Sequence, residues 1–411
     1  MSPRLLRLAV ALAAILGAAL TSPGHAQSRD AAFRAWVEET VWPLARAKGV
    51  SRATFDAALG KAKPDWSLRG LVAPGGKPRG PEWQAEFSSP ARYFSEDKMK
   101  PATAGGRALA AKWAKTLAAV EARYGVPKEI VLAIWGRESA FGKAALPKPA
   151  VTTLATLAFA GDRPQMFLPE LVAALQILEG DHIPLAEMRS SVAGALGQPQ
   201  FLPSKYLAYA VDFDGDGRRD IWKSVPDTLA SIANYLKQHG WVAGAAWGVE
   251  AVVPETVSCA LEGPHQGHPL SAWAKAGVTR VGGGALPGAP GDRRFLMMPA
   301  GRLGPAFIVS QNFYVLKTYN ESDLYALFVG HLADRIAGGR PGFSAGWATV
   351  SGFNRGDVRA MQERMVKKGY DVGEVDGLVG FKTRTAIGLW QAKAGRPVTC
   401  YPDRALIAEI R

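Results

Sequence analysis

Apolar residues recur at helical spacing through most of this chain of 411 residues, and this pattern constrains the fold more than any other feature. Between residues 30 and 59 the apolar stripe consists of Phe33, Trp36, Val37, Val41 and Leu44. Further helices are expected over 107–124, from Pro127 onward, over 150–240 with breaks at 194–203 and 212–220, and over 315–336. Residues 247–309 instead alternate short β-branched runs with Gly/Pro turns. The expected fold class is mainly α, with a small β-rich insertion.

Residues 1–26 have the pattern of a signal peptide. Arg4 and Arg7 precede an apolar run over 8–20, and small residues follow at 24–26. The run is too short to span a bilayer comfortably, and no later stretch is apolar enough to do so. No Cys follows the run to accept a lipid. We therefore expect a periplasmic mature protein that begins near Gln27 and is not lipidated.

The formal net charge is +13, and the positive residues are scattered along the chain. Nucleic-acid recognition favours a basic helix or tail, whereas a scattered excess favours diffuse attraction to an anionic polymer such as the cell wall. The chain has two cysteines, Cys259 and Cys400. They are too few for a thiolate zinc site, and whether they form a disulfide in an oxidising compartment stays open.

The segment over 127–139, PKEIVLAIWGRES, carries the candidate chemistry. Glu138 lies four residues after Ile134 and three after Trp135, which places it at the end of an apolar helix face. Apolar surroundings raise the pKa of a carboxyl, and a protonated carboxyl suits an acid that acts on a glycosidic oxygen. Glu138 could instead be a structural carboxylate that pairs with Arg137 or a nearby Lys. This segment alone does not distinguish a catalytic role from a structural one.

Several sequence motifs occur in the order in which a known enzyme family has them. They are WGRESAFG over 135–142, TTLATLAF over 152–159, SVAGALGQPQFLPSKY over 191–206, AVDFDGDG over 210–217, SIANYLKQHGW over 231–241 and VLKTYN over 315–320. Together they resemble the lytic murein transglycosylase B family across most of residues 30–340, and the expected catalytic region is 27–340. The resemblance implies a lysozyme-like helical catalytic core with a single catalytic acid at Glu138. It also implies substrate contacts at Ser191, Gln200, Phe201, Tyr235, Tyr319, Asn320 and Tyr325, with a looser alignment at Arg163.

The implied reaction cleaves the β-1,4 bond between N-acetylmuramic acid and N-acetylglucosamine in peptidoglycan glycan strands. Ordinary glycosidases use two carboxylates, whereas one carboxyl is implicated here. It would protonate the leaving oxygen and then take the proton of the muramic C6 hydroxyl, which forms a 1,6-anhydro end. No cofactor is required. The alternatives are a lysozyme-type muramidase, which is a hydrolase, and a non-catalytic peptidoglycan-binding protein.

An Asp/Gly loop follows the third motif. It has the spacing of an EF-hand calcium loop, but Lys223 stands where a bidentate Glu is expected. The resemblance implies a structural Ca²⁺, with Asp227 as a later carboxylate, and a metal-free turn is the alternative. The candidate metal residues are Asp212, Asp214, Asp216, Arg218, Asp220 and Asp227.

Residues 354–411 resemble the small three-helix peptidoglycan-binding domain of wall hydrolases, joined by a linker over 341–353. An amphipathic helix begins near Asp357, a turn follows around Gly377, and Thr383 opens a second helix. A generic helical packing domain is the alternative. A wall-binding domain would raise the effective concentration of the enzyme at the strand. Contacts with the cell-wall synthesis or secretion machinery stay open.

Overall fold

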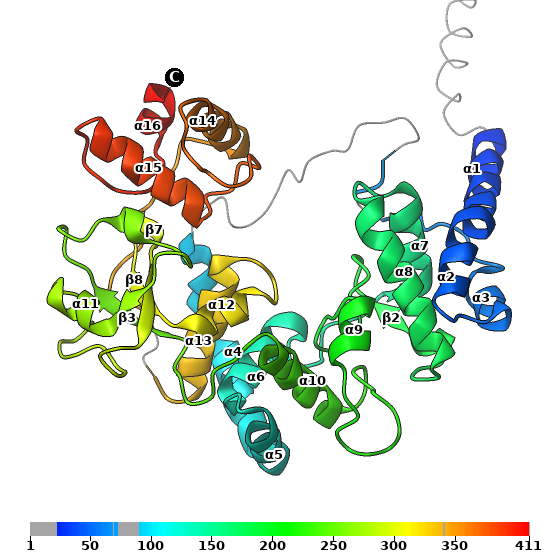
Figure 1. Cartoon of the computed structure of the whole chain (residues 1–411). Coiled ribbons are helices and arrows are strands. Elements are labelled where there is room, and N and C mark those ends of the chain that lie inside the picture. Colours follow the sequence, from blue (N-terminus) through cyan, green and yellow to red (C-terminus); the bar gives the residue numbers. More distant parts are fainter. Residues whose placement is uncertain (1–22, 69, 73–89, 340–341, 411) are drawn as a thin grey trace, which may run out of the picture. The chain divides into compact units, whose positions relative to one another are not determined.

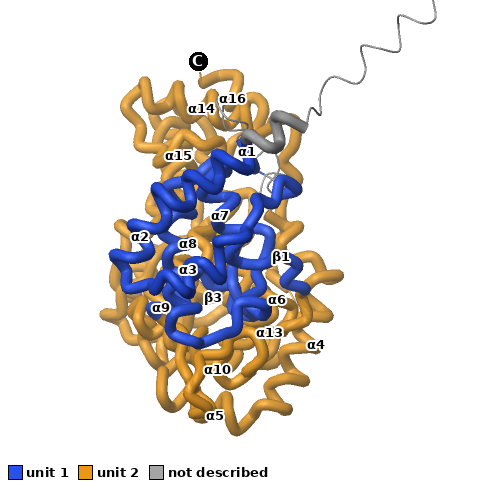
Figure 2. The backbone as a smooth tube through the Cα atoms, turned by 90° about the vertical axis from the view of Figure 1, so that its right-hand side faces the viewer, with its two compact units in different colours: residues 1–79, 145–208 blue, residues 80–144, 209–411 orange. Residues whose placement is uncertain are grey.

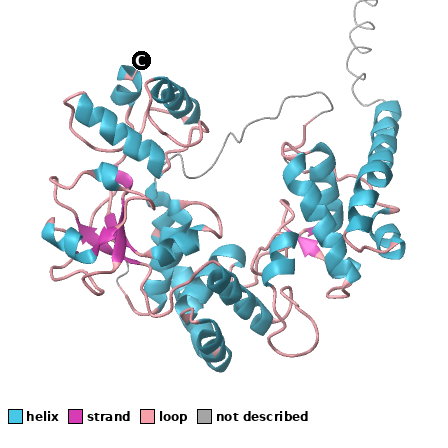
Figure 3. Ribbon diagram, in the orientation of Figure 1, coloured by secondary structure: helices cyan, strands magenta, loops and turns pink. Residues whose placement is uncertain are grey.

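The computed structural model describes residues 23–410 except 69, 73–89 and 340–341 (Figure 1). The expected signal peptide therefore lies almost entirely outside the described residues. Helices dominate, and most strands gather in one part of the chain (Figure 3). The predicted fold class, mainly α with a small sheet and a C-terminal helical domain, is confirmed. Within the described ranges, no helix combines the length and the apolar character that a bilayer crossing requires.

The chain divides into two compact units, coloured separately in Figure 2. Unit 1 comprises residues 1–79 and 145–208. Its core is a helix pair, α7 and α8, most of whose apolar residues are buried. Its described elements are α1 (Pro23–Trp36), a π-helical turn η1 (Val37–Val41), α2 (Trp42–Ala47), α3 (Arg52–Leu59), β1 (Lys148–Pro149), α7 (Ala150–Ala160), α8 (Pro164–Glu179), η4 (Leu185–Glu187), β2 (Arg189–Ser190) and α9 (Pro203–Tyr209).

Unit 2 comprises residues 80–144 and 209–411. Its described helices are η3 (Pro90–Phe94), α4 (Glu96–Lys112), α5 (Ala114–Tyr124), α6 (Lys128–Ser139), α10 (Val225–Gln238), η5 (Cys259–Leu261), α11 (Leu270–Lys275), α12 (Gln311–Lys317), α13 (Asp323–Ile336), α14 (Arg355–Lys367), α15 (Phe381–Lys393) and α16 (Arg404–Glu409). An antiparallel sheet has the order β4-β6-β8-β3-β5. Its strands are β3 (Gly248–Val252), β4 (His268–Pro269), β5 (Thr279–Arg280), β6 (Arg293–Met297) and β8 (Ala306–Val309), with β7 (Pro299–Arg302) beside β8. The β-rich insertion expected over 247–309 is thus present.

The helix expected over 107–124 differs in the structure. Helical structure begins already at Glu96, and Trp113 leaves the helical conformation with φ −105° and ψ 24°, so that α4 and α5 are separate helices. The predicted end is confirmed, because Gly125 adopts φ 71° after Tyr124. A left-handed residue at this position is what ends many helices, and glycine adopts it without strain.

The C-terminal domain, residues 354–410, is bonded to the rest of unit 2. Cys259 and Cys400 form a disulfide, which settles the question that the sequence left open. Cys400 lies in the same buried cluster as residues of the β-rich insertion. Gly388 of α15 permits this close approach, since a Cβ there would lie 2.3 Å from the Cys400 sulfur. The domain also has its own core around Met361 and Ile387.

Candidate active site

Helix α6 is the central helix of its surroundings. Six consecutive residues, from Ile130 to Trp135, are buried, and α6 packs against α4, α10 and α13. The sequence predicted a single apolar stripe, whereas the structure buries all faces of the helix over these residues. Glu138 follows this buried stretch and is half-buried. A fully packed helix is a rigid support for a carboxyl at its end.

The end of α6 is fixed by an unusual turn. Ala140 and Phe141 have φ 49° and 62°, which few residues other than glycine adopt. This turn folds the Phe141 ring back onto the helix, perpendicular to Trp135 with the ring centroids 5.6 Å apart. A Cβ at Gly136 would lie 2.6 Å from the Phe141 ring, so a larger residue there would displace this ring. Glu138 lies between Gly136 and Phe141 in the sequence, in the last turn of the helix that this packing ends.

Tyr325 of α13 donates a hydrogen bond to Glu138, with 2.6 Å between its hydroxyl and Oε1. Tyr325 is 1% exposed. Burial, together with the negative charge of Glu138, holds the pKa of Tyr325 well above its ordinary value. The phenol therefore keeps its proton at physiological pH and serves as a fixed donor to the carboxylate.

Two more of the predicted tyrosines lie in the same cluster. Tyr319 stacks on Tyr325 with the ring centroids 6.1 Å apart and meets Tyr235 edge-on at 4.9 Å. Tyr235 donates from its hydroxyl to the Thr318 carbonyl at 2.7 Å. Burial and the charge of Glu138 raise the pKa of Tyr319 as well. The structure thus brings together four predicted site residues, namely Glu138, Tyr235, Tyr319 and Tyr325, and Asn320 follows them as an exposed residue.

The remaining predicted substrate residues belong to unit 1. Ser191 accepts from the Ala195 backbone N–H at 3.2 Å. Gln200 has φ 54°, a strained conformation that its side chain supports by donating to the Gly197 carbonyl at 2.8 Å. Phe201 has no exposed surface, so its ring lies in the core of unit 1 rather than on a face open to a ligand. Arg163 is exposed and immediately precedes α8.

Three of the six predicted metal residues form one cluster. Asp212, Asp214 and Asp227 place carboxylate oxygens within 4.8 Å of one another. Asp227 is fully buried and accepts the backbone N–H groups of Phe213 and Asp220, each at 2.8 Å. The other three residues are placed differently. Asp216 accepts from the Arg218 backbone and Asp220 from the Trp222 and Lys223 backbones, so these two carboxylates stabilise turns.

Comparison with known proteins identifies the chain. Residues 32–334 match the family described as Transglycosylase SLT domain. The chain belongs to this transglycosylase SLT family. Residues 354–410 of this SLT-family chain match a second family, described as Putative peptidoglycan binding domain.

Relatives of this SLT-family chain include a curated protein and several crystal structures. Membrane-bound lytic murein transglycosylase B of Escherichia coli (strain K12) is 33% identical over 220 residues, which cover 52% of this chain and 58% of that protein. SltB3 from Pseudomonas aeruginosa in complex with NAG-anhNAM-pentapeptide is 38% identical with a TM-score of 0.81, and the match covers 92% of this chain and 99% of that one. Escherichia coli Slt35 in complex with calcium is 26% identical with a TM-score of 0.57, over 74% and 92% of the two chains.

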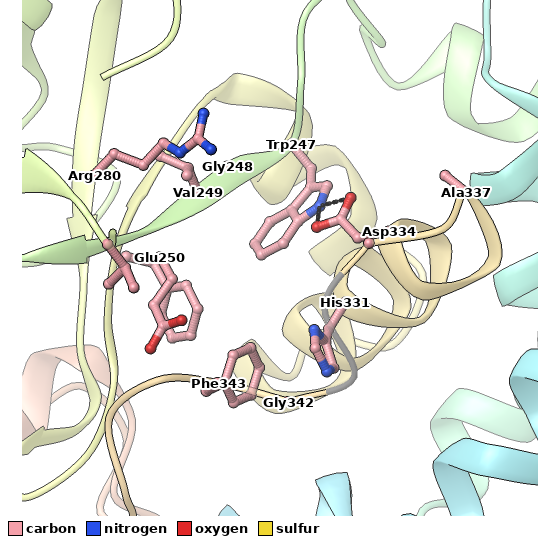
Figure 4. Close-up of a pocket in the computed structure, with 13 residues that line it drawn as sticks. Trp247, Gly248, Val249, Glu250, Arg280, His331, Asp334, Ala337, Gly342 and Phe343 are labelled. Carbon is pink, nitrogen blue, oxygen red and sulfur yellow. Dashed lines mark hydrogen bonds between the residues drawn. The ribbon is translucent and has the colours of Figure 1, made fainter. Parts of the chain in front are cut away.

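A separate cavity of about 410 Å³ lies at the far end of α13 in this SLT-family chain (Figure 4). Asp334 follows Tyr325 by nine residues, which is about 13 Å along a helix. The Trp247 indole N–H lies 3.2 Å from each Asp334 oxygen, and His331 packs against Phe343 with the rings 4.2 Å apart. Glu250 accepts the backbone N–H of Ser344 at 2.8 Å. The segment after α13 is therefore bound to the sheet, although the sequence predicted only a linker there.

Asp334 makes stability depend on pH. Desolvation of its carboxyl beside Trp247 raises its pKa from 3.8 to about 6, although the residue as a whole is exposed, and the Trp247 hydrogen bond opposes this effect. Because the fold favours the protonated carboxyl, the contribution of Asp334 is fully present below its unfolded pKa and is lost as the pH rises to about 6. Asp334→Asn cannot ionise, so its melting temperature should rise relative to wild type between about pH 4 and about pH 7. The effect should be small, because Asp334 is an exposed residue and water screens its charge. A difference that is constant across this range would contradict the assignment.

Two residues that pack against the tyrosines beside Glu138 were not predicted from the sequence. His239 follows Tyr235 by four residues, and its ring stacks on the Tyr235 ring at 3.9 Å. Tyr209 meets the same ring at 4.9 Å. The spacing of four residues was a signal for His239, whereas Tyr209 is brought to the cluster by the fold alone.

Proposed function

We propose that this chain is a lytic transglycosylase of peptidoglycan, with Glu138 as its acid and base. The observation that carries the proposal is the hydrogen bond from buried Tyr325 to Glu138, at the end of the packed helix α6. It holds one carboxyl oxygen of Glu138 in a fixed position. We assign the carboxyl group held in this way to the glycosidic oxygen of the substrate.

A single carboxyl is sufficient for this reaction. Glu138 protonates the oxygen of the bond between N-acetylmuramic acid and N-acetylglucosamine, and the bond to C1 breaks with an oxocarbenium-like transition state. Glu138 then removes the proton of the C6 hydroxyl, whose oxygen bonds to C1 and forms the 1,6-anhydro end. The negative charge of Glu138 also raises the pKa of Tyr319, so the carboxyl and this ring lie close enough to interact. A muramidase normally needs a second carboxylate for water or for a covalent intermediate.

The relatives support the substrate and the cell compartment. One is named a lytic murein transglycosylase, and another was crystallised with NAG-anhNAM-pentapeptide. The proposed substrate is therefore the peptidoglycan glycan strand, and the proposed location is the periplasm, after removal of residues 1–26. We assign wall binding to residues 354–410, which match a putative peptidoglycan binding domain, and substrate contacts to Ser191, Gln200 and Asn320. Phe201 would support its neighbour Gln200 from the core of unit 1.

The product identifies the reaction. Purified protein should release soluble fragments from peptidoglycan, and mass spectrometry should find muramic ends that are lighter by one water than reducing ends. Fragments with reducing ends would establish a muramidase instead. A protein that binds the polymer and releases nothing would be a non-catalytic binder.

We also propose that the cluster of Asp212, Asp214 and Asp227 binds a structural Ca²⁺. Three carboxylates supply the hard oxygen ligands that calcium prefers, and a related chain was crystallised with calcium. The ion would neutralise the crowded charges and hold the loop before α10. It has no role in the bond cleavage.

Removal of calcium should therefore lower the unfolding free energy of the protein, without changing the arrangement of Glu138 and Tyr325. A ligand present at 100 times its dissociation constant stabilises a protein by about 2.7 kcal/mol. We expect a chelator to lower the unfolding free energy of the wild type by about this amount. Asp227→Asn should abolish the response to calcium, while Asp216→Asn, a matched change in the same loop, should keep it. A melting temperature that is independent of calcium in all three proteins would refute the site.

A further inference from the structure

The C-terminal domain contributes a buried cation to unit 2. Arg384 of α15 is 3% exposed and contacts Glu262 through two nitrogens, at 2.6 and 2.9 Å. The same guanidinium contacts Asp323 at 2.9 Å. Glu262 has no exposed side-chain surface, and Asp323 has 8%. Removal of one partner from such a group leaves a buried charge uncompensated, so these contacts strongly fix the positions of the elements that carry them.

Asp323 links the buried ion group around Arg384 to the acid site, by which we mean Glu138 and its hydrogen-bond donor Tyr325. It is the first residue of α13, and Tyr325 follows two residues later. The same first turn is capped by Ser322, whose side chain accepts the Tyr325 backbone N–H at 3.3 Å. Although burial alone would raise the pKa of Asp323, Arg384 and Lys317 hold it below its ordinary value. Asp323 is therefore a charged residue that the Arg384 cation holds in place.

The C-terminal domain also contacts the other end of this segment. Lys317, the last residue of α12, pairs with Asp323 at 2.7 Å. Its ammonium group lies 5.2 Å from the centre of the Phe381 ring in α15. Residues 317–325 contain Tyr319, Asn320 and Tyr325, so the domain fixes both ends of a segment with three predicted site residues.

We propose that Arg384 is a positioning residue for the acid site: through Asp323 it holds Tyr325 against Glu138. The wall-binding domain is thus a support of the active site as well as a binding domain. This inference rests on the proposed function of Glu138. It goes beyond that function because it makes the hydrogen bond to Glu138 depend on a side chain of another domain.

The test compares Arg384→Gln/Glu262→Gln with wild type. The double change removes one positive and one negative charge, so that Lys317 still balances Asp323. We expect kcat to fall about tenfold, within the range of indirect couplings, with KM for a soluble glycan strand nearly unchanged. Because Tyr325 stabilises ionised Glu138, a weaker bond should move the alkaline limb of the kcat–pH profile to higher pH. Tyr325→Phe should move it in the same direction, and adding the double change to Tyr325→Phe should cause little further shift.

Two further variants complete the design. Arg396→Gln is the matched control, because Arg396 lies in the same domain and pairs with Glu409 at the surface. It should keep the wild-type pH profile. If the double variant does not melt cooperatively, Asp323→Asn takes its place, with the same expected shift. If a folded variant keeps the alkaline limb of its kcat–pH profile at the wild-type position, Arg384 is not a positioning residue. If wild type cleaves nothing, or Glu138→Gln still cleaves, the proposed function fails instead.

Discussion

Glu138→Gln should reduce the release of soluble fragments from peptidoglycan by about a thousandfold or more. General acid–base catalysis by one group contributes about 10² to 10⁴ in rate, and here the same group serves both steps. The amide neither gives nor takes the required proton. It still accepts the Tyr325 hydrogen bond, so the packing of α6 and α13 should be retained. The measurement is the initial rate of fragment release, together with the melting temperature.

Glu129→Gln is the matched control for this experiment. Glu129 lies in the first turn of the same helix and pairs with Lys128 at 3.3 Å. It is remote from the Tyr325 hydroxyl along α6, so the variant should retain most of the wild-type rate. Substantial activity in Glu138→Gln would show that another group protonates the leaving oxygen.

Cys259→Ala/Cys400→Ala should lower the unfolding free energy by about 2 to 5 kcal/mol. The bond closes a loop of 141 residues, and long loops lose much chain entropy when they are crosslinked in the unfolded state. Both sulfurs are buried, so the variant also loses apolar packing in the β-rich insertion. Denaturant unfolding, followed by the fluorescence of the tryptophans, would measure the loss.

The Arg384 contacts remain in that variant. We therefore expect the C-terminal domain to stay bound to unit 2 under native conditions, and the enzyme to keep its pH profile. Equal unfolding free energies for the variant and the wild type would mean that the disulfide does not constrain the unfolded chain.

Much of the fold could be predicted from the sequence where local pattern and tertiary structure agree. Gly125 ends α5 as expected, and the apolar residues of 127–139 form a helix. The break at Trp113 could not be predicted, because the helical pattern continues across it on both sides. The burial of all faces of α6 depends on its neighbours α4, α5, α10 and α13, and their arrangement is not encoded in its own periodicity.

The acid and the tyrosines could be predicted from ordered motifs. Their mutual contacts could not, since Glu138 and Tyr325 are 187 residues apart. Arg384 had no local signal at all. Its partners are 61 and 122 residues away, and a buried cation looks in sequence like any helical arginine. Such long-range ion groups become visible only in a structure.

The central claim is that Glu138 cleaves the glycan strand without consuming water. The most direct test is digestion of peptidoglycan in water labelled with heavy oxygen, followed by mass spectrometry of the muramic ends. We predict anhydro ends that carry no heavy oxygen. Muramic ends that carry one heavy oxygen at C1 would show that water attacks the sugar, and would contradict the account.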